Sequence, residues 1–137
     1  MKMKKTMTMS NDSISDFTVQ ELFDLQSHLQ NIMFDKKLPT DNIEDFKYSI
    51  LALISELGEV LDADRRWKNV RKKPLEEPDK KLDELCDCMA FLINAILYSG
   101  FSSKQFIVAF LTKNYKNINR YIDSQIQIGD ENNDSNS

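Results

Sequence analysis

The sequence contains little glycine and little proline, with only 3 of each in 137 residues. Because both residue types mark turns and interrupt helices, their scarcity disfavours a turn-rich β architecture and favours long helices. Cysteine is also scarce. Cys86 and Cys88 would point about 160° apart on a helix, too divergent for a disulfide or a shared metal. We interpret them as unpaired side chains of a protein in a reducing compartment.

A net positive charge is missing as well: the formal charge is -4. General nucleic-acid binders carry a basic face, so this balance argues against that class. No apolar run approaches the ~18 residues of a membrane span, and the opening M-K-M-K-K-T-M-T-M-S lacks the apolar core of a signal peptide. We therefore expect a cytoplasmic protein without nucleic-acid or membrane partners.

The helical signals predict one all-α domain of four helices over residues 16–123. A disordered arm is expected over residues 1–15 and a disordered polar tail over residues 124–137. The predicted helices span about residues 18–34, 43–67, 78–99 and 102–123. Their ends are marked by a capping box at Thr18, a cap at Thr40 or Asp41, a proline in the first turn at Pro78 and a terminating Gly100.

Apolar residues recur at the helical period in every predicted helix, and we expect them to be buried. They are Leu22, Leu25, Leu29 and Ile32 or Met33; then Phe46, Ile50, Leu53, Ile54, Leu57 and Leu61; then Leu82, Leu85, Met89, Leu92, Ile93 and Ile96; and finally Phe106, Phe110 and Tyr115 or Ile118.

Two pairs of carboxylates form the clearest chemical pattern. Glu56 and Glu59 lie three residues apart on the second predicted helix, and Glu84 and Asp87 lie three apart on the third. Residues at this spacing share one helix face, so two neighbouring helices would bring four carboxylates together. Such a group is strongly repulsive unless cations lie between its members. Hard, oxygen-preferring ions, Mg2+ or Mn2+, fit this donor set.

The simplest alternative is that these acids belong to solvated helix faces. Three features favour a metal site instead: the acids adjoin the apolar stripes, the spacing recurs on two helices, and cations follow Trp67 in the connector, beginning with Lys68. Gly58, between the two glutamates, suggests a close approach by a neighbouring helix or a ligand. Trp67 itself has two interpretations, a partly buried aromatic side chain or a contact to substrate.

The order E-x-x-E, a basic W-K segment and E-x-x-D resembles the all-α nucleoside triphosphate pyrophosphohydrolase superfamily. That superfamily includes dimeric dUTPases, MazG-like proteins and dCTP pyrophosphatases. Two further segments resemble the dimeric dUTPase branch: F-T-V-Q-E-L-F-D-L-Q, which ends at Gln26, and K-N-x-x-N-x-x-R, from Lys113 to Arg120. The likeness covers roughly residues 17–121.

The resemblance implies Mg2+-dependent hydrolysis of a nucleoside triphosphate, dUTP by preference, to the monophosphate and pyrophosphate by a homodimer. All four acids would hold metal, and Glu56 or Glu59 would also orient or deprotonate the attacking water. The substrate contacts implied are Gln26, Trp67, Lys68, Lys113, Asn117 and Arg120, with Arg71 or Lys72 as further candidates for phosphate. The alternatives are a MazG-like or dCTP-type base specificity, and a non-catalytic helical module in which the acids pair with the cations of residues 65–73.

Overall fold

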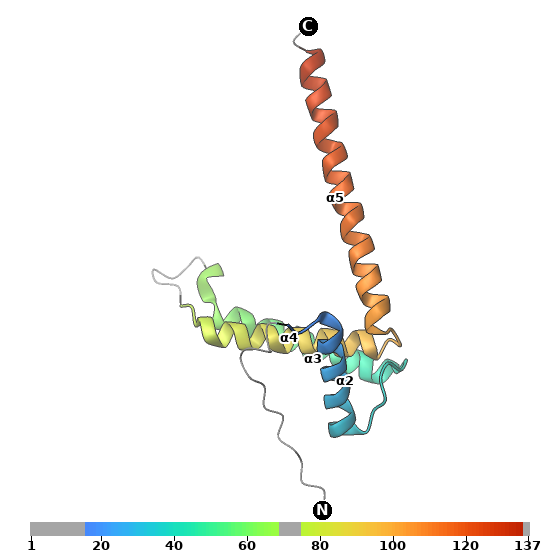
Figure 1. The fold of residues 1–137 in the computed structure, drawn as a ribbon. Helices are drawn as coiled ribbons and strands as arrows, with labels where there is room; N and C mark the ends of the chain where they lie inside the picture. The colour runs from blue at the N-terminus through green and yellow to red at the C-terminus, as the bar shows by residue number, and fades with distance from the viewer. Residues whose placement is uncertain (1–15, 69–74, 136–137) are drawn as a thin grey trace, which may run out of the picture. The chain divides into compact units, whose positions relative to one another are not determined.

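The computed structural model describes residues 16–68 and 75–135, so the predicted arm lies outside the described residues. The described chain contains the α-helices α2 (Val19–Phe34), α3 (Ile43–Ala63), α4 (Pro78–Leu97) and α5 (Ser103–Asp134), together with the 3-10 helix η1 (Arg65–Trp67) (Figure 1). The predicted all-α class with four helices is therefore confirmed. The helices fall into two compact units, divided between Ser103 and Lys104.

Local hydrogen bonds explain where the helices begin. The Thr18 hydroxyl accepts a hydrogen bond from the Glu21 backbone N–H at 3.2 Å, which is the predicted cap of α2. The predicted cap of α3 at Thr40 or Asp41 is wrong, because Asn42 takes this position and its side chain accepts from the Asp45 N–H at 3.1 Å. The α4 helix begins at Pro78, as predicted.

The α3 helix ends at Ala63, four residues before the predicted end at Trp67. Asp64 adopts an extended conformation there, and its backbone pairs with Glu76 in an isolated β-bridge. Its carboxylate accepts a hydrogen bond from the Arg66 backbone N–H at 3.3 Å. These interactions compete with continued helix, so the chain turns into η1 instead.

Helices α3 and α4 form an antiparallel hairpin (Figure 1). The Asp64–Glu76 bridge ties the hairpin at one end, and a second bridge between Asp41 and Ser99 ties it at the other. Gly100 follows α4 with a φ of 83°, and a Cβ there would lie 3.4 Å from Asp41 Cβ. This left-handed position agrees with the predicted role of Gly100 at the helix end.

Helix α2 packs against α4 near the carboxyl end of α4 (Figure 1). Most of the core lies here, around Phe23 of α2, Ile93, Ala95 and Leu97 of α4, and Tyr98, which follows α4; each is at most 4% exposed. Polar side chains are buried in the same region, which is unusual for so small a core. The carboxyl end of α4 is thus the best-packed part of the first unit.

The prediction that the apolar stripes are buried is wrong for much of the hairpin. Ile54, Leu57 and Leu61 on α3 are 60%, 47% and 48% exposed, and Leu82 on α4 is 62% exposed. The remaining exposed stripe residues are Leu22, Leu25, Leu29, Ile32 and Met33 on α2, Leu85, Met89 and Leu92 on α4, and Phe110, Tyr115 and Ile118 on α5. The physical reason is that α3 and α4 form one layer, and α2 covers only one end of it, so an amphipathic face has no partner within this unit.

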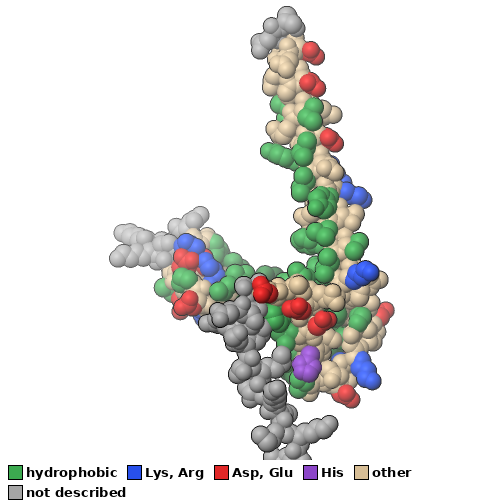
Figure 2. Space-filling view, in the orientation of Figure 1, with side chains coloured by type: hydrophobic (Ala, Val, Ile, Leu, Met, Phe, Trp, Pro, Cys, Tyr) green, Lys and Arg blue, Asp and Glu red, His purple; other side chains and the backbone are tan. Residues whose placement is uncertain are grey.

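Helix α5 continues to Asp134, beyond the predicted end near Asp123 and into the segment expected to be a disordered tail. Propagation of an existing helix costs little compared with its nucleation, so a polar continuation can remain helical. Hydrophobic side chains are exposed along α5 (Figure 2), including Phe110, which was predicted to be buried. Among the described helices, none combines the length and hydropathy that crossing a membrane requires.

Candidate functional site

The hairpin brings the predicted acids together. Glu56 on α3 and Glu84 and Asp87 on α4 each offer a carboxylate oxygen, and these oxygens all lie within 4.8 Å of one another. The antiparallel pairing of α3 with α4 explains this convergence, because it sets the middle of one helix against the first half of the other. We call these three residues, with Glu59, the acidic cluster.

The acidic cluster is strongly coupled electrostatically. Burial raises the pKa of Glu56 above its usual value, and the neighbouring Glu59 raises it further. Interaction with Glu59 and burial, with a smaller contribution from Glu56, raise the pKa of Glu84 to about 7. Glu59 therefore approaches the other acids, although it is more exposed than Glu56 or Glu84. Without cations, the site therefore favours the protonated forms of Glu56 and Glu84.

The donor set fits a divalent cation. Oε2 of Glu56 is buried and has no hydrogen-bond partner, which leaves a carboxylate oxygen without a donor. A hard cation satisfies such an oxygen and removes the repulsion between the acids. The four-acid composition contains no sulfur or imidazole, so it suits Mg2+ or Mn2+ better than zinc or copper.

The nearby cations pair with other acids. Arg66 contacts Asp64 at 2.8 Å and Glu76 at 3.1 Å, and Lys81 contacts the same two carboxylates at 2.9 and 2.7 Å. Across residues 16–68 and 75–135, no ion pair involves a member of the acidic cluster. Within the described part of the connector, residues 65–68, the cations therefore do not form the salt bridges with the cluster that the non-catalytic alternative predicts.

Trp67 and Lys68 lie just after α3. The Trp67 indole N–H donates to the Leu61 carbonyl oxygen at 3.1 Å, and the side chain is 54% exposed, so it is not part of the core. The Lys68 ammonium lies 5.2 Å from the centre of the Trp67 ring, within cation–π range. The candidate phosphate ligands Arg71 and Lys72 lie outside the described residues.

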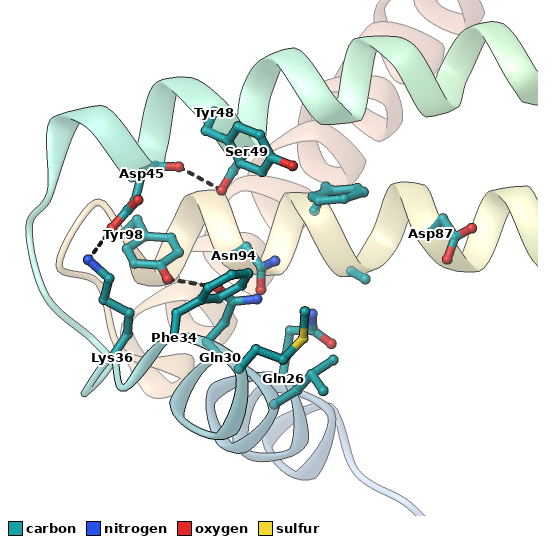
Figure 3. A pocket seen from close by; sticks show the side chains of 14 residues that line it. Gln26, Gln30, Phe34, Lys36, Asp45, Tyr48, Ser49, Asp87, Asn94 and Tyr98 are labelled. Atoms are coloured by element: carbon teal, nitrogen blue, oxygen red, sulfur yellow. Dashed lines mark hydrogen bonds and ion pairs between the residues drawn. The ribbon is translucent and has the colours of Figure 1, made fainter.

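A cavity of about 600 Å³ adjoins the acidic cluster (Figure 3). Side chains of α2, α3 and α4 line it, and Asp87 belongs both to its wall and to the cluster. Its volume is within the usual range for small-molecule pockets. The predicted Gln26 lies in its wall. The other lining side chains include Leu29, Met33, Phe34, Tyr48 and Phe91, which are apolar or aromatic, and Gln30, Ser49, Asn94 and Tyr98, which offer polar groups.

The buried polar residues of this cavity were missed in the sequence. Tyr98 donates a hydrogen bond from its hydroxyl to Oε1 of Gln30 at 2.7 Å, and this contact joins α4 to α2. Asn94 is only 4% exposed, one turn before Tyr98. Two signals were present: Gln30 lies four residues after Gln26 on the same helix face, and Asn94 interrupts the apolar run F-L-I-N-A-I-L.

Three other predicted substrate contacts belong to the second unit. Lys113, Asn117 and Arg120 are exposed on α5, in the second unit, and their spacing places them on one face of that helix. Gly58 is exposed, and a Cβ added to it would meet no described atom within 4 Å. The expected close approach of a neighbouring helix to Gly58 is therefore wrong within the described chain.

Comparison with known proteins identifies the family. A family model described as dUTPase matches residues 18–136, which is most of the chain. Curated proteins and solved structures provide no significant match. The matched region contains both halves of the acidic cluster and all of the cavity wall. The chain therefore belongs to the dUTPase family.

Proposed function

We propose that the protein hydrolyses a nucleoside triphosphate, with dUTP as the preferred substrate, to the monophosphate and pyrophosphate in a Mg2+-dependent reaction. One observation carries the proposal. The acidic cluster has an unpartnered buried oxygen on Glu56, and it opens through Asp87 onto a cavity large enough for a nucleoside. Membership of the dUTPase family supports the same reaction class.

In this proposal Glu56, Glu59, Glu84 and Asp87 hold Mg2+, and Mn2+ is an acceptable substitute. Bound there, Mg2+ would supply positive charge that neutralises the phosphates and makes the attacking water more acidic. Glu56 or Glu59 orients that water or removes its proton. Glu59 suits proton removal because it belongs to the cluster and is more exposed than Glu56.

The remaining substrate contacts are assigned by residue chemistry. Lys68 and Arg120 offer cationic groups for the outer phosphates, and Lys113 adds a third. Trp67 presents an exposed ring beside Lys68. Gln26 and Asn117 carry amides that can both donate to and accept from a pyrimidine edge. Of these residues, Gln26 already lies in the cavity wall.

We also propose that the protein is a homodimer that acts in the cytoplasm. The exposed apolar residues of α3 and α4 support the dimer, because a second copy would bury a face that the first unit leaves uncovered. Unpaired Cys86 and Cys88 are compatible with a reducing compartment.

Pyrophosphate release from each deoxynucleoside triphosphate, measured with Mg2+ and with a chelator, tests this proposal. We expect dUTP to give dUMP and pyrophosphate only with Mg2+, and Glu59→Gln to reduce kcat by about a hundredfold or more. Asp83→Asn is the matched control, because Asp83 is an exposed acid one residue before Glu84 and outside the cluster. Turnover of dCTP with dUTP inert would overturn the preferred substrate, and no turnover of any triphosphate would overturn the reaction.

A further inference from the structure

Asn94 is a buried polar residue whose position in the core has no structural explanation. It lies in α4 between buried Ile93 and Ala95 and is 4% exposed, and its Oδ1 has no hydrogen-bond partner. A buried acceptor without a partner destabilises a folded protein, because it loses its water and gains nothing in exchange. Such a group in a cavity wall suggests that a ligand supplies the missing donor.

The other buried polar groups of the cavity already have partners. The Ser49 hydroxyl donates to the Asp45 carbonyl oxygen at 2.8 Å, and the Asp45 carboxylate pairs with Lys36 at 3.0 Å. Tyr98 and Gln30 bond to each other. Of the fully buried side-chain atoms that the structure describes in this wall, Oδ1 of Asn94 is the one left without a hydrogen bond or an ion pair.

The Tyr98–Gln30 hydrogen bond gives the neighbouring amide a defined orientation. The Tyr98 hydroxyl donates to Oε1 of Gln30 at 2.7 Å, and Figure 3 draws this contact in the same part of the cavity as Asn94. Because Oε1 of Gln30 faces the Tyr98 hydroxyl, the orientation of the amide is fixed, and its NH2 group is the donor that Gln30 can offer to a ligand. The cavity therefore presents a donor from Gln30 and an acceptor from Asn94.

The position of Asn94 relative to the acidic cluster suits the base of a nucleotide. Asn94 follows Asp87 by seven residues, which is two turns of α4 on the same face and about 10 Å of helix rise. Both residues line the cavity. If the phosphates of a nucleotide lie at the acidic cluster, its sugar lies between Asp87 and Asn94 and its base lies near Asn94.

We propose that Asn94 is a specificity-determining residue whose Oδ1 accepts a hydrogen bond from the N3–H of a uracil base. This inference rests on the proposed function. Gln30 donates from its NH2 group to a neighbouring uracil carbonyl, and Tyr98 positions Gln30. Cytosine has an acceptor at N3 in place of a donor, so it would face the Asn94 oxygen with a lone pair. A site that hydrogen-bonds one base rejects the other because its own buried groups are left unpaired.

The test compares dUTP with dCTP in wild type, Asn94→Leu and Tyr98→Phe. We expect Asn94→Leu, which keeps similar volume without polar atoms, to lower kcat/KM for dUTP by about tenfold or more and to leave that for dCTP unchanged or higher. It should also raise the Tm of the ligand-free protein, because an unpartnered buried acceptor is removed. Tyr98→Phe should lower the dUTP-to-dCTP ratio, since Gln30 is then free to turn. Ser99→Ala is the control and should leave the ratio unchanged, because the Ser99 hydroxyl donates to the Ala95 carbonyl oxygen and Ser99 does not line the cavity.

An unchanged dUTP-to-dCTP ratio in both Asn94→Leu and Tyr98→Phe overturns the inference, and a lower Tm of Asn94→Leu with an unchanged ratio identifies Asn94 as purely structural. If Asn94→Leu fails to fold, the ratio measured with Tyr98→Phe decides.

Binding of dUMP and dCMP, measured by calorimetry, tests this inference separately from the hydrolysis reaction. A protein that hydrolyses no triphosphate but binds dUMP through Asn94 refutes the proposed function alone. A protein that prefers dUTP over dCTP by the same ratio in wild type, Asn94→Leu and Tyr98→Phe refutes the Asn94 inference alone.

Discussion

Lys81 of α4 donates to Oδ2 of Asp64, the residue that ends α3, at 2.9 Å. Asp64 also accepts a hydrogen bond from the Arg66 guanidinium, and Glu76 forms ion pairs with both Arg66 and Lys81. The Arg66 and Lys81 charges hold the pKa of Asp64 well below its usual range. This network fastens one end of the hairpin two turns from Glu56, so it fixes the alignment on which the acidic cluster depends.

Replacing Asp64 should therefore destabilise the hairpin. Asp64→Ala removes the acceptor of Arg66 and Lys81 and leaves two cations without this partner, so we expect a Tm lower by several degrees in a thermal melt. Asp62→Ala is the matched control, since Asp62 is an exposed acid two residues earlier whose side chain makes no described ion pair. Equal melting of the two variants would show that the network does not hold the hairpin.

The metal-free protein should lose stability as the pH rises toward neutrality. Glu84 has a folded-state pKa of about 7, above its usual value of 4.5, so the folded protein binds this proton more tightly than the unfolded chain does. Stability from Glu84 is present below about pH 4.5 and is lost as the pH rises to about 7. We expect the Tm in a chelator to fall across this window, and Glu84→Gln to flatten the fall. A Tm independent of pH between these values in wild type would contradict the coupling of Glu84 with Glu59.

Lys68 and Arg66 should behave differently when their charges are removed. Arg66 is held by Asp64 and Glu76, so Arg66→Met should lower the Tm. Lys68 makes a ring contact with Trp67 but no described ion pair, which leaves its charge for phosphate. We expect Lys68→Met to raise KM for the triphosphate several-fold with little change in Tm. Steady-state kinetics and thermal melts separate the two effects, and a KM unchanged in Lys68→Met would remove Lys68 from the substrate site.

The exposed apolar stripe of α3 should mediate association. Ile54 and Leu61 are 60% and 48% exposed, and a dimer would bury them. Light scattering should give about twice the chain mass of 16.0 kDa for wild type. The double variant Ile54→Ser with Leu61→Ser should shift toward the monomer mass, while Val19→Ser, an exposed apolar residue at the start of α2, should not. A wild-type mass near 16.0 kDa would contradict the dimer.

Local signals in the sequence predict much of this fold. The Thr18 capping box, Pro78 and Gly100 act through their own backbone positions, and each lies where it was expected. The end of α3 was predicted too late because Asp64 is held by Glu76 and Lys81, which are distant in sequence. The predicted burial of Leu57 and Leu82 fails because periodicity identifies an apolar face but not what covers it.

The candidate site was predictable to a similar extent. The spacing of the acids predicts that the carboxylates of Glu56 and Glu84 converge on one site, because helix geometry fixes the face that each residue occupies. The cavity depends on how α2 crosses the hairpin, which no local pattern specifies. Asn94 and Tyr98 therefore emerge only from the tertiary structure, although the lone Asn in an apolar run is a usable signal.

A calorimetric titration of Mg2+ with the non-hydrolysable analogue α,β-imido-dUTP tests the central claim most directly, that the acidic cluster holds the metal for a triphosphate. We expect the wild-type protein to bind the analogue tightly only with Mg2+, and Glu56→Gln to weaken this binding by about tenfold or more. Asp83→Asn should match wild type. Binding that is indifferent to Mg2+, or equal in wild type and Glu56→Gln, would contradict the account.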